Sequence, residues 1–293
     1  MASRTAHGAT ARGRRRPRRA AWWGGVLLLV AVVAVVSAVV TLTGALSRNT
    51  ALITEECTVV NGSVTYRLQP DQAANAALIS GITVRRNLLP RAASIAVATA
   101  LQESKLRNIT YGDRDSIGLF QQRPSQGWGT AEQIMDPGYA TNAFYNHLAA
   151  IPGYERLPIT EAAQRVQLSA YPDAYARHEP VARSFASALT GQSPAALACT
   201  LRPPSTNASP AGVVGAAVAV FGPRNVSAEG PTAVITASGT DGWAVAQWAV
   251  ATAARLQVTA VEFDGKRWER GRGSWAPATN VANDRVRITV AQS

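Results

Sequence analysis

The sequence predicts a mainly α-helical domain that is preceded by a single transmembrane helix and followed by a small α+β domain. Three observations predict this class: an uncharged apolar run near the amino end, a succession of short helical segments that begin at prolines, and a later change to alternating strand patterns. The predicted boundaries are a tail over 1–20, a span over 21–47, a helical domain over 55–200, a linker over 201–212 and an α+β module over 213–293.

The amino-terminal charge pattern predicts a membrane anchor. Residues 1–19 hold seven arginines and no acidic residue, so most of the net charge of +11 lies in this tail. Residues 20–47 carry no ionisable side chain, and a helix of that length crosses a hydrocarbon core of about 30 Å. The run also exceeds the roughly 7 to 15 apolar residues of a cleaved signal peptide. Because the arginines precede the span, we expect a cytoplasmic amino terminus at the plasma membrane and extracytoplasmic carboxy-terminal domains.

The arginine-rich tail has two interpretations. Such arms bind the phosphates of nucleic acids, but here no aromatic side chain is interleaved with the arginines. A positive-inside signal that contacts anionic lipid therefore explains the tail better, and no specific nucleic-acid partner is expected.

The two cysteines agree with an external location. Cys57 and Cys199 both follow the apolar run, and a pair of cysteines outside the membrane most often forms one disulfide. Two unrelated buried thiols are the alternative.

Helix signals succeed one another between the cysteines, where we expect about five helices and no strand. Pro70 opens one helix with Gly81 as its stop, and Pro90 opens the next. Later starts are predicted at Asp136, at Thr160 and at Pro180.

After Cys199 a stretch rich in Pro, Ser and Thr predicts a linker, and the α+β module follows. Asp264 and Gly265 predict a hairpin turn between two of its strands. Its aromatic residues divide by position: Trp243 and Trp248 have helical spacing and are expected in the core. Trp268 and Trp275 flank a basic run and, where exposed, could stack on sugar rings or meet anionic wall polymers. We interpret the module as a binding or interaction domain without catalytic residues.

Glu103 is the candidate catalytic residue of the helical domain. It shares a helix face with small apolar residues, and burial among them would raise the pKa of its carboxyl group to the range that a general acid needs. Arg107 lies four residues later, so an ordinary surface salt bridge with Glu103 is the alternative, and it would lower that pKa.

The order of three short motifs, "ALQESKL", "SIGLFQQ" and "LSAYPDAY", resembles the lysozyme-like domain of lytic transglycosylases over roughly residues 70–195. That family has a helical Glu-Ser, a Gly-Leu-x-Gln loop and a later Ala-Tyr element. Matching residues in this chain are Glu103, Ser104, Gly118, Leu119, Phe120, Gln121, Ala170 and Tyr171.

The resemblance implies a peptidoglycan substrate with Glu103 as the only catalytic carboxylate. In this family the acid protonates the glycosidic oxygen between N-acetylmuramic acid and N-acetylglucosamine, and the acetamido oxygen of the substrate stabilises the cation at C1. The same glutamate then takes the proton of the C6 hydroxyl, which gives a 1,6-anhydro end. Gln121 and Ser104 would orient the glutamate or the acetamido group, and Tyr171 would approach the reacting sugar.

The sequence also departs from the family pattern. Pro172 and Asp173 follow Tyr171, where the family has Asn-Ala-Gly. The loop before Gly118 carries two aspartates, Asp113 and Asp115, of which either is a candidate second carboxylate for a hydrolysing muramidase.

The same two aspartates raise the question of a bound ion. A calcium loop is rejected because Pro124 stands where an acidic twelfth residue is needed. The alternative is that both aspartates cap turns. No metal site and no cofactor are expected.

The loop that follows supplies amides and an aromatic ring for sugar binding. Gln122 and Gln126 could bond hydroxyl and acetamido groups, and Trp128 could offer a flat ring, unless this tryptophan packs on its own core. The principal alternative to an enzyme is a peptidoglycan-binding or envelope scaffold protein that keeps the fold without turnover, because catalytic and inactive forms of one fold bury the same surfaces.

Overall fold

The structure is a computed structural model that describes residues 28–39, 53–168 and 172–292. It divides into two units, Met1–Leu52 and Ile53–Ser293. In the first unit, residues 28–39 form an exposed helix that covers part of the predicted span, and the rest of residues 21–47 lies outside the described residues. Among the helices that the structure describes, none combines the length and the apolar character that crossing a bilayer requires.

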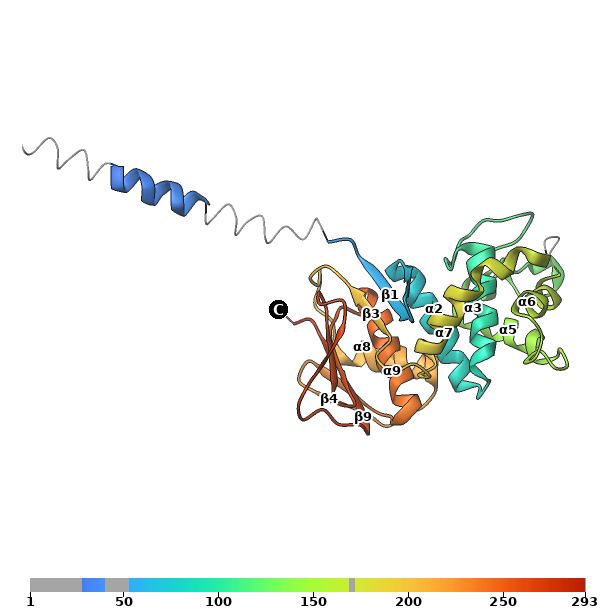
Figure 1. Ribbon diagram of the computed structural model, residues 1–293. Helices are drawn as coiled ribbons and strands as arrows, with labels where there is room; N and C mark the ends of the chain where they lie inside the picture. The colour runs from blue at the N-terminus through green and yellow to red at the C-terminus, as the bar shows by residue number, and fades with distance from the viewer. Residues whose placement is uncertain (1–27, 40–52, 169–171, 293) are drawn as a thin grey trace, which may run out of the picture. The chain divides into compact units, whose positions relative to one another are not determined.

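The second unit is a mixed α+β structure (Figure 1), so the mainly α prediction holds only for its first part. Six α-helices and two short 3-10 segments lie between the cysteines in the described residues. They are α2 (Pro70–Arg85), α3 (Pro90–Ser104), η2 (Pro124–Gln126), α4 (Ala131–Met135), α5 (Pro137–Ala149), α6 (Ile159–Gln167), η3 (Pro172–His178) and α7 (Glu179–Leu189).

Prolines and caps fix where these helices begin. Pro70 and Pro90 occupy the first turns of α2 and α3, as predicted, since a missing N–H costs nothing there. Asp136 accepts hydrogen bonds from the first turn of α5, also as predicted. Two predictions were wrong. Helix α6 begins at Ile159, one residue before the predicted cap. Helix α2 passes through Gly81 and does not end there. Residue 81 is a glycine because a side chain at this position would collide with Val220.

The expectation of no strand between the cysteines was also wrong. A three-stranded antiparallel sheet has the order β2-β1-β3, formed by β1 (Glu56–Asn61), β2 (Val64–Leu68) and β3 (Leu197–Thr200). Cys57 and Cys199 lie directly opposite each other on β1 and β3 and form the predicted disulfide. The strand pattern is hard to detect because these strands are short and β1 and β2 alternate only weakly.

The carboxy-terminal part combines three helices with a six-stranded antiparallel sheet whose order is β4-β5-β9-β6-β7-β8. Its elements are α8 (Pro210–Phe221), β4 (Val226–Glu229), β5 (Thr232–Thr236), α9 (Gly239–Ala251), α10 (Ala253–Leu256), β6 (Val258–Phe263), β7 (Lys266–Glu269), β8 (Trp275–Pro277) and β9 (Arg285–Val290). Asp264 and Gly265 form the predicted hairpin turn between β6 and β7, and both have positive φ.

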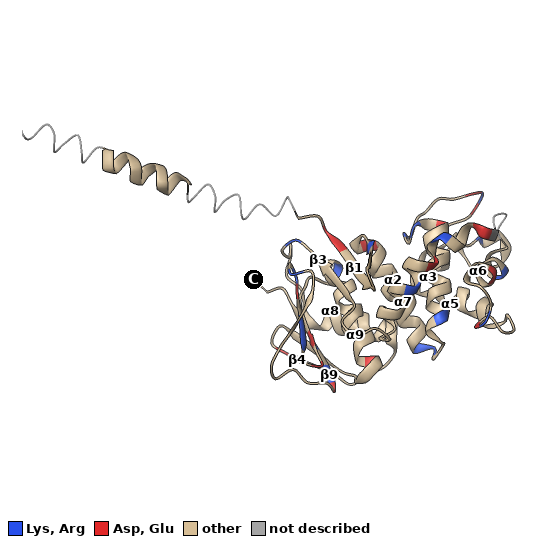
Figure 2. Cartoon of the chain, in the orientation of Figure 1, with Lys and Arg blue, Asp and Glu red and all other residues tan. Residues whose placement is uncertain are grey.

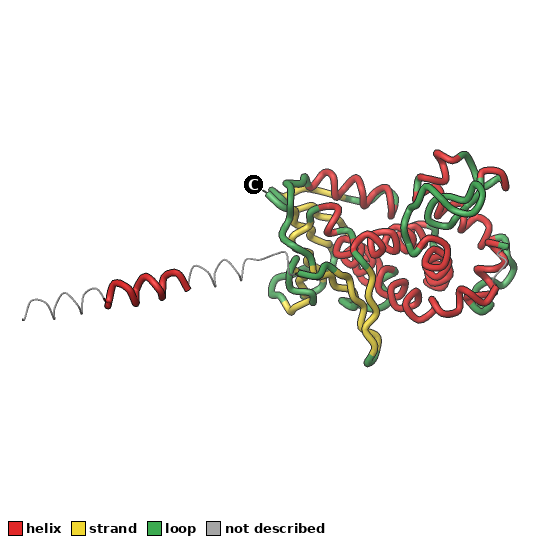
Figure 3. Tube along the Cα trace, turned by 90° about the horizontal axis from the view of Figure 1, so that it is seen from above, coloured by secondary structure: helices red, strands yellow, loops and turns green. Residues whose placement is uncertain are grey.

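Helix α9 joins the two parts into one core. It packs against α2, α7 and β3 on the helical side and against β6 and β9 of the large sheet. Figure 3 shows the strands gathered at one end of this unit and the helices α9, α2 and α7 leading to the other. In Figure 2 these central helices are drawn mostly in tan, because uncharged residues make up most of the core. Leu201 and Val213, at the two ends of the predicted linker, are buried in this core, and the residues between them, 202–212, are exposed or partly exposed.

The four tryptophans of this part all serve the core or its border. Trp243 and Trp248 are buried, as predicted. A ligand-stacking role requires exposed rings, which Trp268 does not have and Trp275 has only in part. Trp268 is fully buried and donates its indole N–H to the Cys199 carbonyl at 3.1 Å. Trp275 is half-buried and donates to the Leu197 carbonyl at 2.7 Å. Both indoles therefore connect the large sheet to β3.

Candidate active site

Helix α3 places Glu103 at the border between core and solvent. The helix is buried from Ala92 to Ala100, and it ends at Lys105, which adopts a left-handed conformation. Glu103 therefore lies in the last turn, where the chain leaves the core and a long side chain reaches the surface of the domain. The helix dipole disfavours a negative charge at this end.

The hydrogen-bond partners of the Glu103 carboxyl group are neutral side chains, Tyr175 and Gln167. Burial raises the pKa of the carboxyl group above 4.5, and hydrogen bonds from Tyr175 and Gln167 lower it again by less. The Tyr175 hydroxyl donates to Glu103 Oε1 at 2.7 Å. In the described part of the chain, Glu103 forms no ion pair with a lysine or arginine, so it meets the requirement for a carboxyl group that keeps its proton at a higher pH than usual.

The alternative of a surface salt bridge with Arg107 was wrong. Arg107 turns away from α3 and donates from Nε to Asp71 Oδ2 at 2.8 Å. The reason is that both Lys105 and Leu106 adopt left-handed conformations, so the helix stops and Arg107 no longer lies one turn beyond Glu103 on the same face.

The loop that carries Gly118–Gln121 is fixed to the end of α3. The Ser104 hydroxyl donates to the Leu119 carbonyl at 2.7 Å and accepts from the Arg107 N–H at 3.2 Å. Gly118 has a φ of 80°, and a side chain there would collide with the Ile134 carbonyl, so glycine is required. A backbone bridge between Ile117 and Gln122 closes the loop.

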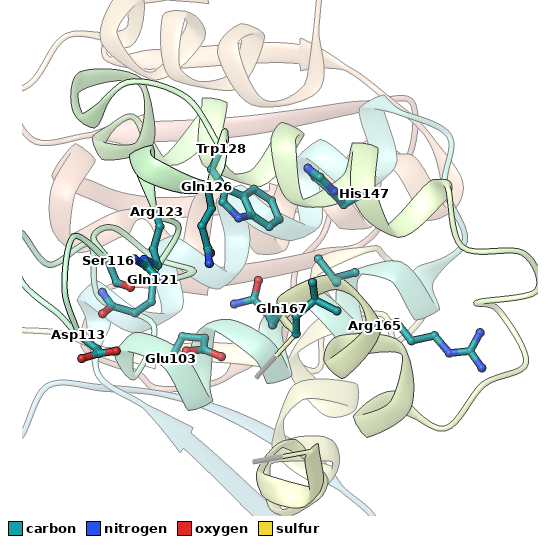
Figure 4. A pocket seen from close by; sticks show the side chains of 12 residues that line it. Glu103, Asp113, Ser116, Gln121, Arg123, Gln126, Trp128, His147, Arg165 and Gln167 are labelled. Atoms are coloured by element: carbon teal, nitrogen blue, oxygen red, sulfur yellow. The ribbon is translucent and has the colours of Figure 1, made fainter. Parts of the chain in front are cut away.

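Glu103 opens into a cleft of about 780 Å³. Figure 4 shows that Glu103 and Asp113 lie on one side of it, Trp128 and His147 on the opposite side, and Gln167 between them. Uncharged polar groups predominate close to the carboxyl group. The lining residues are Glu103, Asp113, Ser116, Gln121, Arg123, Gln126, Trp128, His147, Arg165, Val166, Gln167 and Leu168.

Gln121 is the residue of the Gly118–Gln121 motif that lines the cleft, beside Gln126 and Trp128 of the loop that follows. Its amide donates to the carbonyls of Tyr111 and Gly118, at 3.2 and 3.3 Å. Leu119 and Phe120 are fully buried, and Phe120 stacks on Phe144 in the core.

Three further predicted residues, Gly118, Ser104 and Gln122, shape the loop and do not line the cleft. Gln122 is almost fully buried and donates its amide to the Ala140 carbonyl at 3.0 Å, which ties the loop to α5. Tyr171 lies outside the described residues.

The two candidate second carboxylates have different environments. Asp115 does not line the cleft, and Arg123 and the Ser125 backbone N–H hold it at 2.7 and 2.8 Å. Its hydrogen bonds with Arg123 and Ser125 keep the pKa of this carboxyl group far below the usual range, which makes it a poor base. Asp113 lines the cleft and is highly exposed. Asp113 is therefore the better candidate for activating water.

Sequence reasoning missed Tyr175 and Gln167. Tyr175 is fully buried on η3, and Gln167 ends α6 and donates to the Phe120 carbonyl at 2.7 Å. A signal for Tyr175 was present, because Ala174-Tyr175 repeats the Ala-Tyr pair four residues after Ala170-Tyr171. The cleft also contains Trp128, which packs against the core, and its ring centre lies 4.2 Å from that of the His147 ring.

The described residues contain no group of three or more His, Cys, Asp or Glu side chains that could hold a metal ion. Compared with known proteins, the chain matches no protein-family model and no curated protein sequence. The geometry of the cleft therefore carries the functional argument, together with the motifs that resemble lytic transglycosylases.

Proposed function

We propose that this protein is a membrane-anchored peptidoglycan lytic transglycosylase that cleaves the bond between N-acetylmuramic acid and N-acetylglucosamine with Glu103 as its single catalytic carboxyl group. The observation that carries the proposal is the environment of Glu103: a carboxyl group in an open cleft, desolvated, bonded by a tyrosine hydroxyl and without a basic partner among the described side chains. A general acid needs this combination.

The chemistry uses the two protonation states of one group. Protonated Glu103 donates its proton to the glycosidic oxygen as the bond breaks, and the acetamido oxygen of the substrate stabilises the developing cation. The ionised carboxylate then removes the proton of the C6 hydroxyl, which closes the 1,6-anhydro ring and restores the acid. Burial favours the protonated form, while the Tyr175 hydroxyl stabilises the ionised form, so that both states are accessible.

Amide groups suit the recognition of this substrate. Gln121, Gln126 and Gln167 line the cleft around the carboxyl group, and amides can both donate to acetamido carbonyls and accept from sugar hydroxyls. The Trp128 ring at the opposite side adds an apolar surface.

The location rests on two further observations. The disulfide between Cys57 and Cys199 is typical of an oxidising compartment. The arginine-rich tail and the uncharged run 20–47 favour a single anchor with the amino terminus in the cytoplasm and anionic lipid beside the tail.

A muramidase is the second candidate, and the position of Asp113 favours it. An exposed carboxylate in the same cleft as the acid could activate a water molecule, as the base of an inverting glycosidase does. The product distinguishes the two, since hydrolysis leaves a reducing end in place of an anhydro end.

The test is digestion of purified sacculi by the full-length chain in detergent, with mass spectrometry of the released fragments. We expect anhydro-ended muropeptides, and the Glu103→Gln variant should lose about 10²–10⁴-fold of the rate, the usual contribution of a general acid. Glu132→Gln is the matched control, because Glu132 is an exposed carboxylate on α4 outside the cleft.

Each other outcome has a defined meaning. Reducing-end products that disappear in Asp113→Asn would establish the muramidase. Binding of sacculi without any product from the parent chain would overturn the enzyme and favour the scaffold protein.

A further inference from the structure

We infer that Gln102 is a positioning residue, whose side-chain carbonyl holds the 3-10 segment η3 in place and thereby keeps the Tyr175 hydroxyl on Glu103. The inference rests on the proposed function for its catalytic consequence, but its geometry is independent of the substrate. The reaction scheme gives Gln102 no part, although this residue directly precedes Glu103 in the sequence.

Segment η3 needs anchors from outside. It has seven residues, Pro172–His178, and a 3-10 segment of that length has poor internal hydrogen-bond geometry. It packs against α3, α6 and α7. Tyr175 at its centre is fully buried, so a small displacement of the segment would move the hydroxyl that donates to Glu103.

Gln102 supplies such an anchor at the carboxy-terminal end of η3. Its Oε1 atom accepts a hydrogen bond from Arg177 Nη2 at 2.8 Å and lies 3.1 Å from His178 Nε2. Burial and the neighbouring Arg177 lower the pKa of His178, and Arg177 Nε donates to His178 Nε2 at 3.2 Å. The Arg177 guanidinium supplies the charged donor at the Gln102 carbonyl. Hydrogen bonds to a charged donor are the stronger kind.

Gln102 and Glu103 are consecutive on α3 and therefore point about 100° apart around the helix axis. One side chain holds the end of η3 while the other receives the hydroxyl from its middle. This two-point attachment fixes the position of Tyr175 relative to the carboxyl group. When the Gln102 attachment is lost, the carboxy-terminal end of η3 is held by its packing against the helices without this hydrogen bond, and we expect the bond from Tyr175 to Glu103 to lengthen or break.

The consequence is a change in proton affinity at Glu103. The Tyr175 hydrogen bond lowers the pKa of the carboxyl group against the effect of burial. Without it, that pKa rises further. The other charged or titratable residues of the cleft are Asp113, Arg123, His147 and Arg165, and a neutral substitution at residue 102 changes none of them.

The experiment is an NMR titration of the full-length chain in detergent with ¹³C-labelled glutamate carboxyl groups and without substrate. The Glu103 signal is assigned as the one that disappears in Glu103→Gln. We expect the Glu103 pKa to rise in Gln102→Met and in Tyr175→Phe, and to rise no further when the two are combined. Gln192→Met is the control, because Gln192 is an exposed glutamine outside the cleft.

An unchanged Glu103 pKa in Gln102→Met beside a raised one in Tyr175→Phe would overturn the inference. Should Gln102→Met fail to fold, Gln102→Ala removes the same carbonyl without a change of charge and gives the same test. The proposed function is tested separately by products from sacculi, so its failure leaves the titration result intact and interpretable. If both hold, the basic limb of the pH–rate profile of Gln102→Met moves to higher pH.

Discussion

The cleft around Glu103 and the junction between the large sheet and β3 use their unusual residues in opposite ways. At the cleft, a carboxyl group remains half-buried although burial destabilises its charged form. At the junction, the indoles of Trp268 and Trp275 bury their rings and satisfy their N–H groups on the carbonyls of Cys199 and Leu197. The first arrangement costs stability and suits chemistry, whereas the second adds stability and leaves little surface for a ligand.

The disulfide should show the largest effect on the stabilising side of this comparison. Cys57 and Cys199 are 142 residues apart, and closing a loop of that length stabilises the fold by about 5 kcal/mol in the chain-entropy model. We expect Cys57→Ser combined with Cys199→Ser to lower the free energy of unfolding by about that amount in urea titrations. A loss below about 1 kcal/mol would mean that the reduced, unfolded chain retains structure that already keeps the two ends together.

Trp268→Ala should come next. The side chain is fully buried and bonded to β3, so its removal should cost about 3–5 kcal/mol. Chemical denaturation measures this, with binding of the folded variant to sacculi as a second readout. If Trp268→Ala has normal stability but binds glycan more weakly, the contrast between the two regions fails, because Trp268 would then bind a ligand at the surface.

Ser104→Ala tests how firmly the loop is held to α3. The buried hydroxyl serves the Leu119 carbonyl and the Arg107 N–H, and leaving such partners unpaired should cost about 1–3 kcal/mol. We expect lower stability in urea. We also expect slower turnover of sacculi, because the same loop carries Gln121, which lines the cleft. Slower turnover at unchanged stability would instead indicate that Ser104 acts on the substrate.

The smallest expected effect is a gain in stability. Folding raises the pKa of Glu103 above 4.5. The contribution of Glu103 to the stability of the fold is therefore complete below that pH, and it is lost as the pH rises through the folded-state pKa. Glu103→Gln should therefore match the parent near pH 4 and become the more stable protein toward neutral pH, as thermal melting across this range would show. A variant that is less stable than the parent at pH 7 would contradict a desolvated carboxyl group.

The same shift predicts the pH dependence of activity. General-acid catalysis needs the protonated carboxyl group, so cleavage should decline as the pH rises through the Glu103 pKa. Rates of muropeptide release across the pH range measure this decline. If the rate falls only toward acid pH, a base limits the reaction, and Asp113→Asn is the variant to test.

Local signals in the sequence were sufficient for several elements. Pro70, Pro90 and Asp136 marked helix starts correctly because a proline or a cap acts within one turn. Asp264-Gly265 marked the hairpin, since its turn requires positive φ at two adjacent residues. Gly81 misled the prediction because its reason is a distant contact with Val220.

By itself, the sequence determined the uncharged run with its arginine tail, the cysteine pair, most helix starts and Glu103 as the candidate acid. The first three depend on residue type and short spacing, whereas Glu103 was singled out by the resemblance of its motifs to those of lytic transglycosylases. Only the tertiary structure decided that Arg107 pairs with Asp71, that Tyr175 and Gln167 bond the carboxyl group, and that Trp268 faces the core. The physical reason is that burial and hydrogen bonding join residues that are far apart along the chain, and a pKa follows from those neighbours and not from the residues beside it in sequence.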